Sequence, residues 1–346
     1  MSIVNTRIQN VRANSGLDNN ELRPSRYGGL SVYMSQTDEE AGIISKELKD
    51  KARSSIGSTL EVPVIDFDQN VTIGNSRQLV IADDENTSQM YQVSFQTYAW
   101  GFTMVPVMYH NNEIGYQKDW TTKFNKYLYK LGAVLDTACL ASLATAKSQV
   151  ILDPLTYAVT ANKLTATYDE RENILGDLGP IMSSNDHFNN INIIGNGGIE
   201  SMVNKLAQKG LYNSENKRLE YLDKSFHFTP RLTNAATEHA NGFAVQDGSV
   251  GMLTRFEREA LYGGSMPDGT IWGTDVLPML NLPVGYYYYM SKGDFSTIAG
   301  AATADMDRVR KEHYGFAVDI AYLTPYNSDP ANIANPIVQF AINKPV

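Results

Sequence analysis

The sequence TTKFNKYLYKLGAVLDTACLASLATAKSQV, residues 121–150, decides the fold. Apolar side chains recur in it at steps of three or four residues, the period of an amphipathic helix. They are Phe124, Leu128, Leu131, Leu135, Cys139 and Leu143, with Tyr127, Val134, Ala138 and Ala146 widening the stripe. No proline interrupts the stretch. We therefore expect one helix of roughly 28 residues and roughly 40 Å, far longer than the average helix of about 11 to 12 residues.

Polar residues mark both ends of this expected helix. Asp119 or Thr121 can cap its amino end, and Lys147 places a cation in the last turn, where the helix dipole favours it. Asp153-Pro154 closes the segment. Because the sequence before and after the helix has mostly β-type patterns, we predict an α+β protein arranged around one spine helix.

Composition limits the kind of protein this is. The 346 residues are 42% hydrophobic and 19% charged, which is typical of globular proteins. A net charge of -9 argues against general binding of nucleic acid through a basic surface, although a local basic patch remains possible.

Cys139 is the only cysteine, so an intrachain disulfide is impossible, and its place on the apolar stripe predicts a small buried side chain. We expect neither a signal peptide nor a membrane span.

The first 36 residues lack clear periodicity and are predicted to form an extended arm. Two interpretations stay open for this arm, a solvated tail or a segment ordered against a neighbouring subunit. Thr37-Asp38-Glu39-Glu40 matches a capping box and predicts a short helix through Ser54. Lysines on one side of that helix fit either solvent or a contact with nucleic acid.

From Ser58 the apolar period changes to two, which predicts several strands before the spine. Their apolar residues are Leu60, Val62 and Val64, then Val71, Ile73, Leu79, Val80 and Ile81, then Tyr91, Val93, Phe95, Tyr98 and Phe102. After Pro154 we expect a helix over 170–178, a strand over 191–194, a helix over 199–208, and strands over 219–228, 242–250, 286–290, 314–320 and 337–342.

Motifs for catalysis are weak. Gly195-Asn196-Gly197-Gly198 is expected between a strand and a helix, as in a dinucleotide-binding motif. However, Glu200 occupies the position where that motif has its third glycine. A turn that needs glycine for backbone freedom is the favoured interpretation. The five histidines, His110, His187, His227, His239 and His313, are scattered without metal-ligand spacing.

Two further patterns have simpler explanations than a ligand site. Asp83-Asp84-Glu85 fits a solvated hairpin tip better than a cation site. In a strand over Tyr286–Tyr289, half the rings would face the core, so packing is favoured over stacking on bases. We therefore predict no enzyme, no cofactor and no metal, and a structural or assembly role.

The order of segments resembles the major capsid proteins of tailed bacteriophages, which have the Hong Kong 97-type fold. The resemblance is carried by TTKFNKYLYKLGAVLDTACLASLATAK (121–147), SFQTYAWGFTMVPVMY (94–109), HFNNINIIGNGGIESMVNKL (187–206), LPVGYYYY (282–289) and HYGFAVDIAYLTPYNSDPANIANPIVQFAI (313–342). It implies five segments. These are an amino-terminal arm with a short helix (1–57), an extended β-hairpin loop (58–108), a peripheral domain with the spine (109–159), an axial domain (160–310), and strands returning to the peripheral domain (311–346).

The function implied by the resemblance is shell building. Hexamers and pentamers would close into an icosahedral capsid around double-stranded DNA, without sequence-specific binding or a membrane. The protein would assemble in the host cytoplasm and reside in the virion. A portal and, because only about 36 residues precede the first expected helix, a separate scaffolding protein are the other implied partners. The alternatives are a nucleotide-binding enzyme using the turn at Gly195, and another virion component such as a tail-tube or decoration protein.

Overall fold

The computed structural model describes residues 3–14, 26–37, 46–54, 59–64, 89–109, 112–148, 157–188, 190–206, 220–221, 224–255, 263–267, 269–292, 310–327 and 333–345. The predicted long helix is present as α4 (Glu113–Ala146), whose 34 residues give a length of about 51 Å. It begins earlier than expected because Tyr116 and Trp120 continue the buried stripe toward the amino end. Asn112 caps it, not Asp119 or Thr121, by accepting a hydrogen bond from the Gly115 N–H at 2.8 Å.

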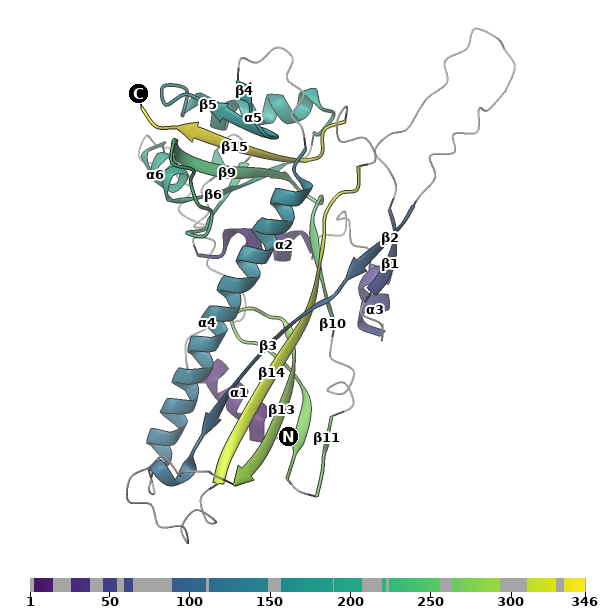
Figure 1. Ribbon diagram of the computed structural model, residues 1–346, viewed down its shortest axis with the longest axis vertical. Coiled ribbons are helices and arrows are strands. Elements are labelled where there is room, and N and C mark those ends of the chain that lie inside the picture. The colour runs from purple at the N-terminus through teal and green to yellow at the C-terminus, as the bar shows by residue number, and fades with distance from the viewer. Residues whose placement is uncertain are drawn as a thin grey trace, which may run out of the picture.

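A six-stranded antiparallel sheet lies along α4 (Figure 1). Its central strand is β14 (Arg310–Leu323), which pairs with β13 (Pro283–Lys292) on one side. On its other side β14 pairs with β3 (Gln96–Met104), whereas β10 (Gly251–Arg255) pairs with the carboxyl end of β14 on the same side as β13. β12 (Ile271–Val276) and β11 (Gly264–Ser265) complete the sheet beyond β13. The sheet therefore joins segments more than 200 residues apart in the sequence.

A seven-stranded mixed sheet lies at the carboxyl end of α4 (Figure 1). Its strands, in spatial order, are β4 (Ala158–Val159), β5 (Lys163–Ala166), β15 (Ile337–Asn343), β9 (Glu238–Gln246), β6 (Ile191–Gly195), β8 (Lys224–Phe228) and β7 (Glu220–Tyr221). The helices α5 (Asn173–Ser184) and α6 (Gly197–Leu206) contribute to its second core.

The described amino-terminal residues are mostly helical, and the prediction of an extended arm was wrong for residues 3–14 and 28–36. α1 (Ile3–Asn14) buries Val4, Ile8 and Val11, which share one helix face. α2 (Gly28–Thr37) buries most of its length. Because both helices pack on the body of the same chain, neither open interpretation of the arm describes them. The spacing of the three apolar residues in α1 was present in the sequence and was overlooked.

The capping-box prediction at Thr37 was also wrong. Thr37 is the last residue of α2, and its hydroxyl accepts a hydrogen bond from the Met252 N–H at 2.9 Å. The side chain that could have capped a following helix is therefore bound to β10. The next described helix is α3 (Lys46–Ser54), so the expected carboxyl end at Ser54 was correct. Residues 38–45 lie outside the described part.

The β-rich stretch before the spine includes an antiparallel pair. β1 (Thr59–Val64) pairs with β2 (Gln89–Ser94) in continuous register, from Thr59 opposite Ser94 to Val64 opposite Gln89. The residues expected to form strands over 71–81, and the acidic turn at Asp83, lie outside the described residues. Leu60, Val62 and Val93 pack with residues of α3, β10 and β14 in a small core of their own.

Several later predictions are confirmed with shifted ends. The helix expected over 170–178 is α5, which continues through Pro180 because Ile181 and Met182 are buried. The strand expected over 242–250 is β9 from Glu238, and a turn then leads into β10. The strands at Tyr286, Tyr314 and Ile337 are present as parts of β13, β14 and β15.

Each of the two large sheets contains strands from more than one of the segments that the sequence suggested. β12 and β13 fall within 160–310 but pair in the sheet of β14, and β15 falls within 311–346 but pairs with β5 and β9. The main core runs without interruption from the six-stranded sheet, along α4, to Ile194 and Phe243 of the seven-stranded sheet. The α+β class is thus confirmed, with two large sheets that share one core along α4.

Among the described helices, only α4 is long and apolar enough to cross a membrane by length and composition. Of its most apolar 18-residue window, 44% is buried inside the fold. A helix in the core of a globular fold has the same properties, and α4 packs along the six-stranded sheet and reaches the seven-stranded sheet at its carboxyl end.

Candidate functional site

The apolar stripe predicted on the spine lies in the main core. Phe124, Leu128, Leu131, Leu135, Cys139 and Leu143 are each at most 6% exposed. Phe124 meets Phe316 of β14 edge to face, with ring centroids 5.4 Å apart. Two residues expected to widen the stripe, Tyr127 and Val134, are instead 39% exposed. The true stripe includes Tyr116, Trp120 and Leu140, which the sequence interpretation missed.

Cys139 is a buried free thiol. Burial, with a smaller effect from the nearby Asp136 charge, raises the pKa of the Cys139 thiol well above its ordinary value. A protonated thiol without solvent access is a poor nucleophile, so the residue serves packing.

Asp136 is a fully buried carboxylate on the same helix, and the sequence interpretation did not identify it. Its Oδ1 accepts a hydrogen bond from the Leu30 N–H at 3.0 Å, in the first turn of α2. Its Oδ2 accepts one from the Thr229 hydroxyl at 2.6 Å and lies 3.4 Å from Arg231 Nη1. A carboxylate at a helix amino end also complements the helix dipole. Asp136 therefore connects α4, α2 and the segment that follows β8.

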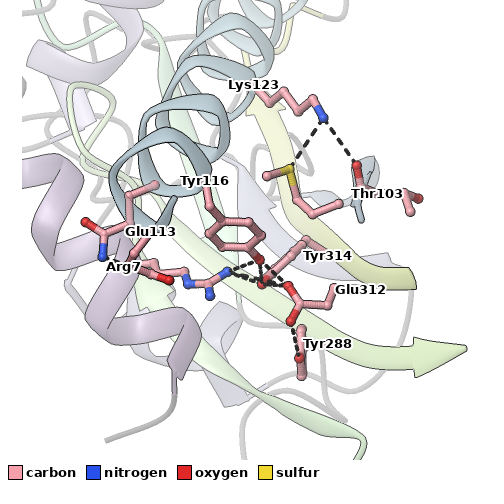
Figure 2. A network of polar contacts seen from close by, with 10 residues as sticks. Arg7, Thr103, Glu113, Tyr116, Lys123, Tyr288, Glu312 and Tyr314 are labelled. Carbon is pink, nitrogen blue, oxygen red and sulfur yellow. Dashed lines mark hydrogen bonds and ion pairs between the residues drawn. The ribbon is translucent and has the colours of Figure 1, made fainter. Parts of the chain in front are cut away.

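A second polar cluster holds α1 against α4 and the six-stranded sheet (Figure 2). Arg7 Nη1 donates hydrogen bonds to the hydroxyls of Tyr116, at 2.8 Å, and Tyr314. Glu312 accepts from Tyr116 and Tyr314 and lies 3.8 Å from Arg7 Nη1. Tyr288 completes the cluster by donating to Glu312 at 3.4 Å.

Burial controls the acid–base properties of this cluster. It raises the pKa of Tyr116 to about 12, with a further increase from the hydrogen bond to Glu312. Burial likewise raises the pKa values of Tyr288 and Tyr314. The three phenols therefore remain protonated donors at neutral pH, which suits a structural cluster better than proton transfer.

The turn at Gly195 is a capped strand-to-helix connection, as the sequence favoured. Asn196 Oδ1 accepts hydrogen bonds from the N–H groups of Gly198, at 3.1 Å, and Ile199, at 3.4 Å. These are the donors that a phosphate would need. A Cβ on Gly198 would lie 2.7 Å from the His239 carbonyl oxygen, so close packing against β9 explains that glycine. The local geometry thus accounts for the motif without a nucleotide.

The described histidines have separate environments. His187 bonds the Ala334 carbonyl at 2.9 Å, His227 bonds Asn192 at 3.3 Å, and His239 packs edge to face on Tyr168. Within the described ranges, no three His, Cys, Asp or Glu side chains are grouped as metal ligands. His110 and the Asp83-Asp84-Glu85 run fall outside those ranges.

The tyrosine run of β13 alternates as expected. Tyr286 and Tyr288 are buried in the main core, whereas Tyr287 and Tyr289 are 47% and 37% exposed. Tyr289 stacks on His313 of β14 with ring centroids 4.5 Å apart. The outward rings thus lie on the sheet face opposite the buried ones.

Comparison with known proteins gives likenesses of structure. No family profile matches this sequence, and no curated protein matches it. A chain in the structure "Cyanophage Pam1 capsid asymmetric unit" is 11% identical, with a TM-score of 0.49, over 94% of this chain and 93% of that one. A chain of "Microbacterium phage Oxtober96" is 13% identical, with a TM-score of 0.44, over 89% and 96%. A chain of "Capsid of Ralstonia phage GP4" is 7% identical, with a TM-score of 0.44, over 94% and 93%.

Proposed function

We propose that this chain is the major capsid protein of a tailed bacteriophage, a structural subunit and not an enzyme. The observation that carries the proposal is the arrangement of α4. One helix of 34 residues packs along a sheet of six strands and ends at a second sheet of seven. An elongated subunit of this kind offers long sides for contact with neighbours, as a thin closed shell requires.

The polar clusters support the same function. The carboxylate of Asp136 and the guanidinium of Arg7 fix the relative positions of helices and sheets through their hydrogen bonds. Rigid connection of the two sheets suits a subunit that must present the same contacts many times. In this proposal, hexamers and pentamers of the chain enclose double-stranded DNA in the virion.

The segments of the capsid fold can be assigned by sheet. α4 and the six-stranded sheet would form the peripheral domain, and the seven-stranded sheet with α5 and α6 would form the axial domain. β1 and β2 would form the base of the extended loop over 58–108. A portal and a separate scaffolding protein remain proposed partners.

Electron microscopy of the purified full-length chain tests this function. We expect capsomers or closed shells, with light scattering showing a large assembly at high protein concentration. Open tubes would favour a tail-tube protein instead. A monomer that persists at high concentration, both alone and with a scaffolding protein from the same virus, would overturn the proposal.

A further inference from the structure

The amino-terminal half of α4 carries an excess of positive charge on its outer side. Residues 118–130 contain four lysines against one aspartate, in a chain whose net charge is -9. Lys118, Lys126 and Lys130 are all exposed, and they follow one row of the helix at steps of four or eight residues. This set, called the lysine row below, extends over about 18 Å.

None of the three acidic groups of α4 forms an ion pair with the lysine row. Glu113 accepts a hydrogen bond from Gln117 at 3.1 Å. Hydrogen bonds from Tyr109 and Lys123 lower the pKa of Asp119, and the Lys126 charge adds a smaller effect. Asp119 forms its ion pair with Lys123, whose Nζ lies 3.0 Å from Asp119 Oδ2. Asp136 is fully buried and bonded to Leu30 and Thr229. Across the described part of the chain, no ion pair involves a member of the lysine row.

A further cation comes from a distant part of the sequence. Arg26 is exposed just before α2, and its guanidinium lies 4.8 Å from the ring centroid of Tyr129 on α4. The Arg26 carbonyl accepts a hydrogen bond from Arg231 Nη1 at 2.7 Å, which fixes the backbone at this point. Because Tyr129 follows Lys126 by three residues, the two side chains are neighbours on the helix surface, and the fold adds the arginine beside the lysine row.

We propose that the lysine row and Arg26 bind the phosphate backbone of double-stranded DNA. The inference rests on the proposed capsid function, which supplies duplex DNA as the enclosed partner. Duplex DNA carries one negative charge per about 1.7 Å of axis, so a row of about 18 Å faces roughly ten charges. Ammonium groups contact phosphates without reading bases, so binding is independent of sequence and depends strongly on salt.

The test measures binding of a fluorescent DNA duplex to the full-length chain by anisotropy over a series of salt concentrations. The test variant combines Lys118→Glu, Lys126→Glu and Lys130→Glu. A matched control combines Lys46→Glu, Lys205→Glu and Arg310→Glu, three exposed cations on other elements, and so changes the net charge by the same amount. The slope of log K against log salt is negative, and we expect it to become shallower by about 2.7 in the test variant, at about 0.9 per lost phosphate contact. The control should keep the slope of the unmodified chain.

Three results would overturn this inference. They are an unmodified chain that fails to bind duplex DNA at low salt, equal loss of slope in the test and control variants, and tighter binding of poly-glutamate than of DNA through the same lysines. Electron microscopy of the same samples separates this inference from the proposed function. Shells that form without affinity for DNA overturn only the DNA contact, whereas chains that bind DNA but never assemble overturn only the capsid function.

Discussion

Asp136 shows how one residue can connect elements that are distant in the sequence. The Leu30 N–H, the Thr229 hydroxyl and the Arg231 guanidinium all point at its fully buried carboxylate. Asp136→Ala would leave these donors without an acceptor. We expect the free energy of unfolding to fall by about 3 kcal/mol or more, as when one partner of a buried ion pair is removed. Urea denaturation measures the change.

Asp119→Ala is the matched control for this prediction. Asp119 lies on the same helix, but its ion pair with Lys123 is about one-third exposed on both sides. An exposed pair contributes about 0 to 1 kcal/mol, and the hydrogen bond that the Tyr109 hydroxyl donates to Asp119 adds about 1 kcal/mol, so a loss of no more than about 2 kcal/mol is expected. If the two variants lost the same stability, Asp136 would not hold the place in the fold that its contacts indicate.

His313 makes stability depend on pH. Burial lowers the pKa of its imidazole, and the nearby Lys311 charge lowers it further. Because the unfolded state then binds more protons than the folded state, this contribution is present above the ordinary pKa of about 6.5 and is lost as pH falls below it. Between pH 8 and pH 5, the melting temperature of the unmodified protein should fall more than that of His313→Gln. If the melting temperatures of the unmodified protein and of His313→Gln fell equally with pH, protonation of another group would cause the acid sensitivity.

At the scale of elements, α1 should depend on a single arginine for much of its attachment. Arg7 bonds Tyr116 and Tyr314 and lies over both rings, with 4.8 Å to the Tyr116 centroid. In Arg7→Ala, we expect amide hydrogen exchange in α1 to accelerate at least tenfold, a loss of about 1.4 kcal/mol, while the centre of α4 stays protected. Arg7→Lys should give partial protection, because a lysine keeps the charge but not the planar donors. Unchanged exchange in α1 would contradict this role.

The spine helix was predictable from sequence because its apolar period persists over many turns. The amino end of the helix was not predictable. Tyr116 and Trp120 look like loop residues in the sequence, and only the structure shows that they contact Tyr314 of β14. The apolar face of α1, with Val4 and Ile8, is short, and the polar residues around it make its helical period hard to recognise in the sequence. Asp136 was hidden for a different reason. A charge on an apolar stripe looks like an exception, and its partners lie about 100 residues away in sequence.

The two faces of α4 should tolerate charge very differently. Leu131 is 6% exposed in the main core, whereas Val134 is 39% exposed three residues later. Leu131→Asp would bury a carboxylate without a partner, at a cost of several kcal/mol, and should prevent both folding and assembly. Val134→Asp should fold as the unmodified chain does, as judged by circular dichroism and thermal melting. Normal folding of Leu131→Asp would mean that the stripe is not the centre of the core.

At the scale of the whole molecule, the order of strands was beyond prediction from the sequence. β3 pairs with β14 from Gln96 opposite Ile320 to Met104 opposite Glu312, and β15 enters the other sheet beside β5. Local periodicity fixes which residues form strands but does not fix which strands meet. The expected segment boundaries therefore followed the sequence order, while the sheets combine strands from both sides of α4.

α2 links the two sheets, and Gly28 sets how closely it can lie. α2 packs on α4, on β10 of the six-stranded sheet, and on β6 and β8 of the seven-stranded sheet. A Cβ on Gly28 would lie 2.9 Å from backbone atoms of Phe228, and no rotation of a side chain could relieve that contact. Gly28→Ala should therefore move α2 away from β8 and lower the free energy of unfolding by about 1 to 3 kcal/mol.

Calorimetry of the full-length protein is the measurement for Gly28→Ala. We expect one transition for the unmodified chain, because the sheets share a core, and a lower, broader transition for the variant as the sheets begin to unfold separately. Gly315→Ala is the control, since the nearest atom to its new Cβ, the Tyr287 carbonyl oxygen, is 3.7 Å away. It should change stability by no more than about 0.5 kcal/mol. If both variants kept the single transition at its original temperature, the link between the sheets would not depend on the close approach of α2 to β8.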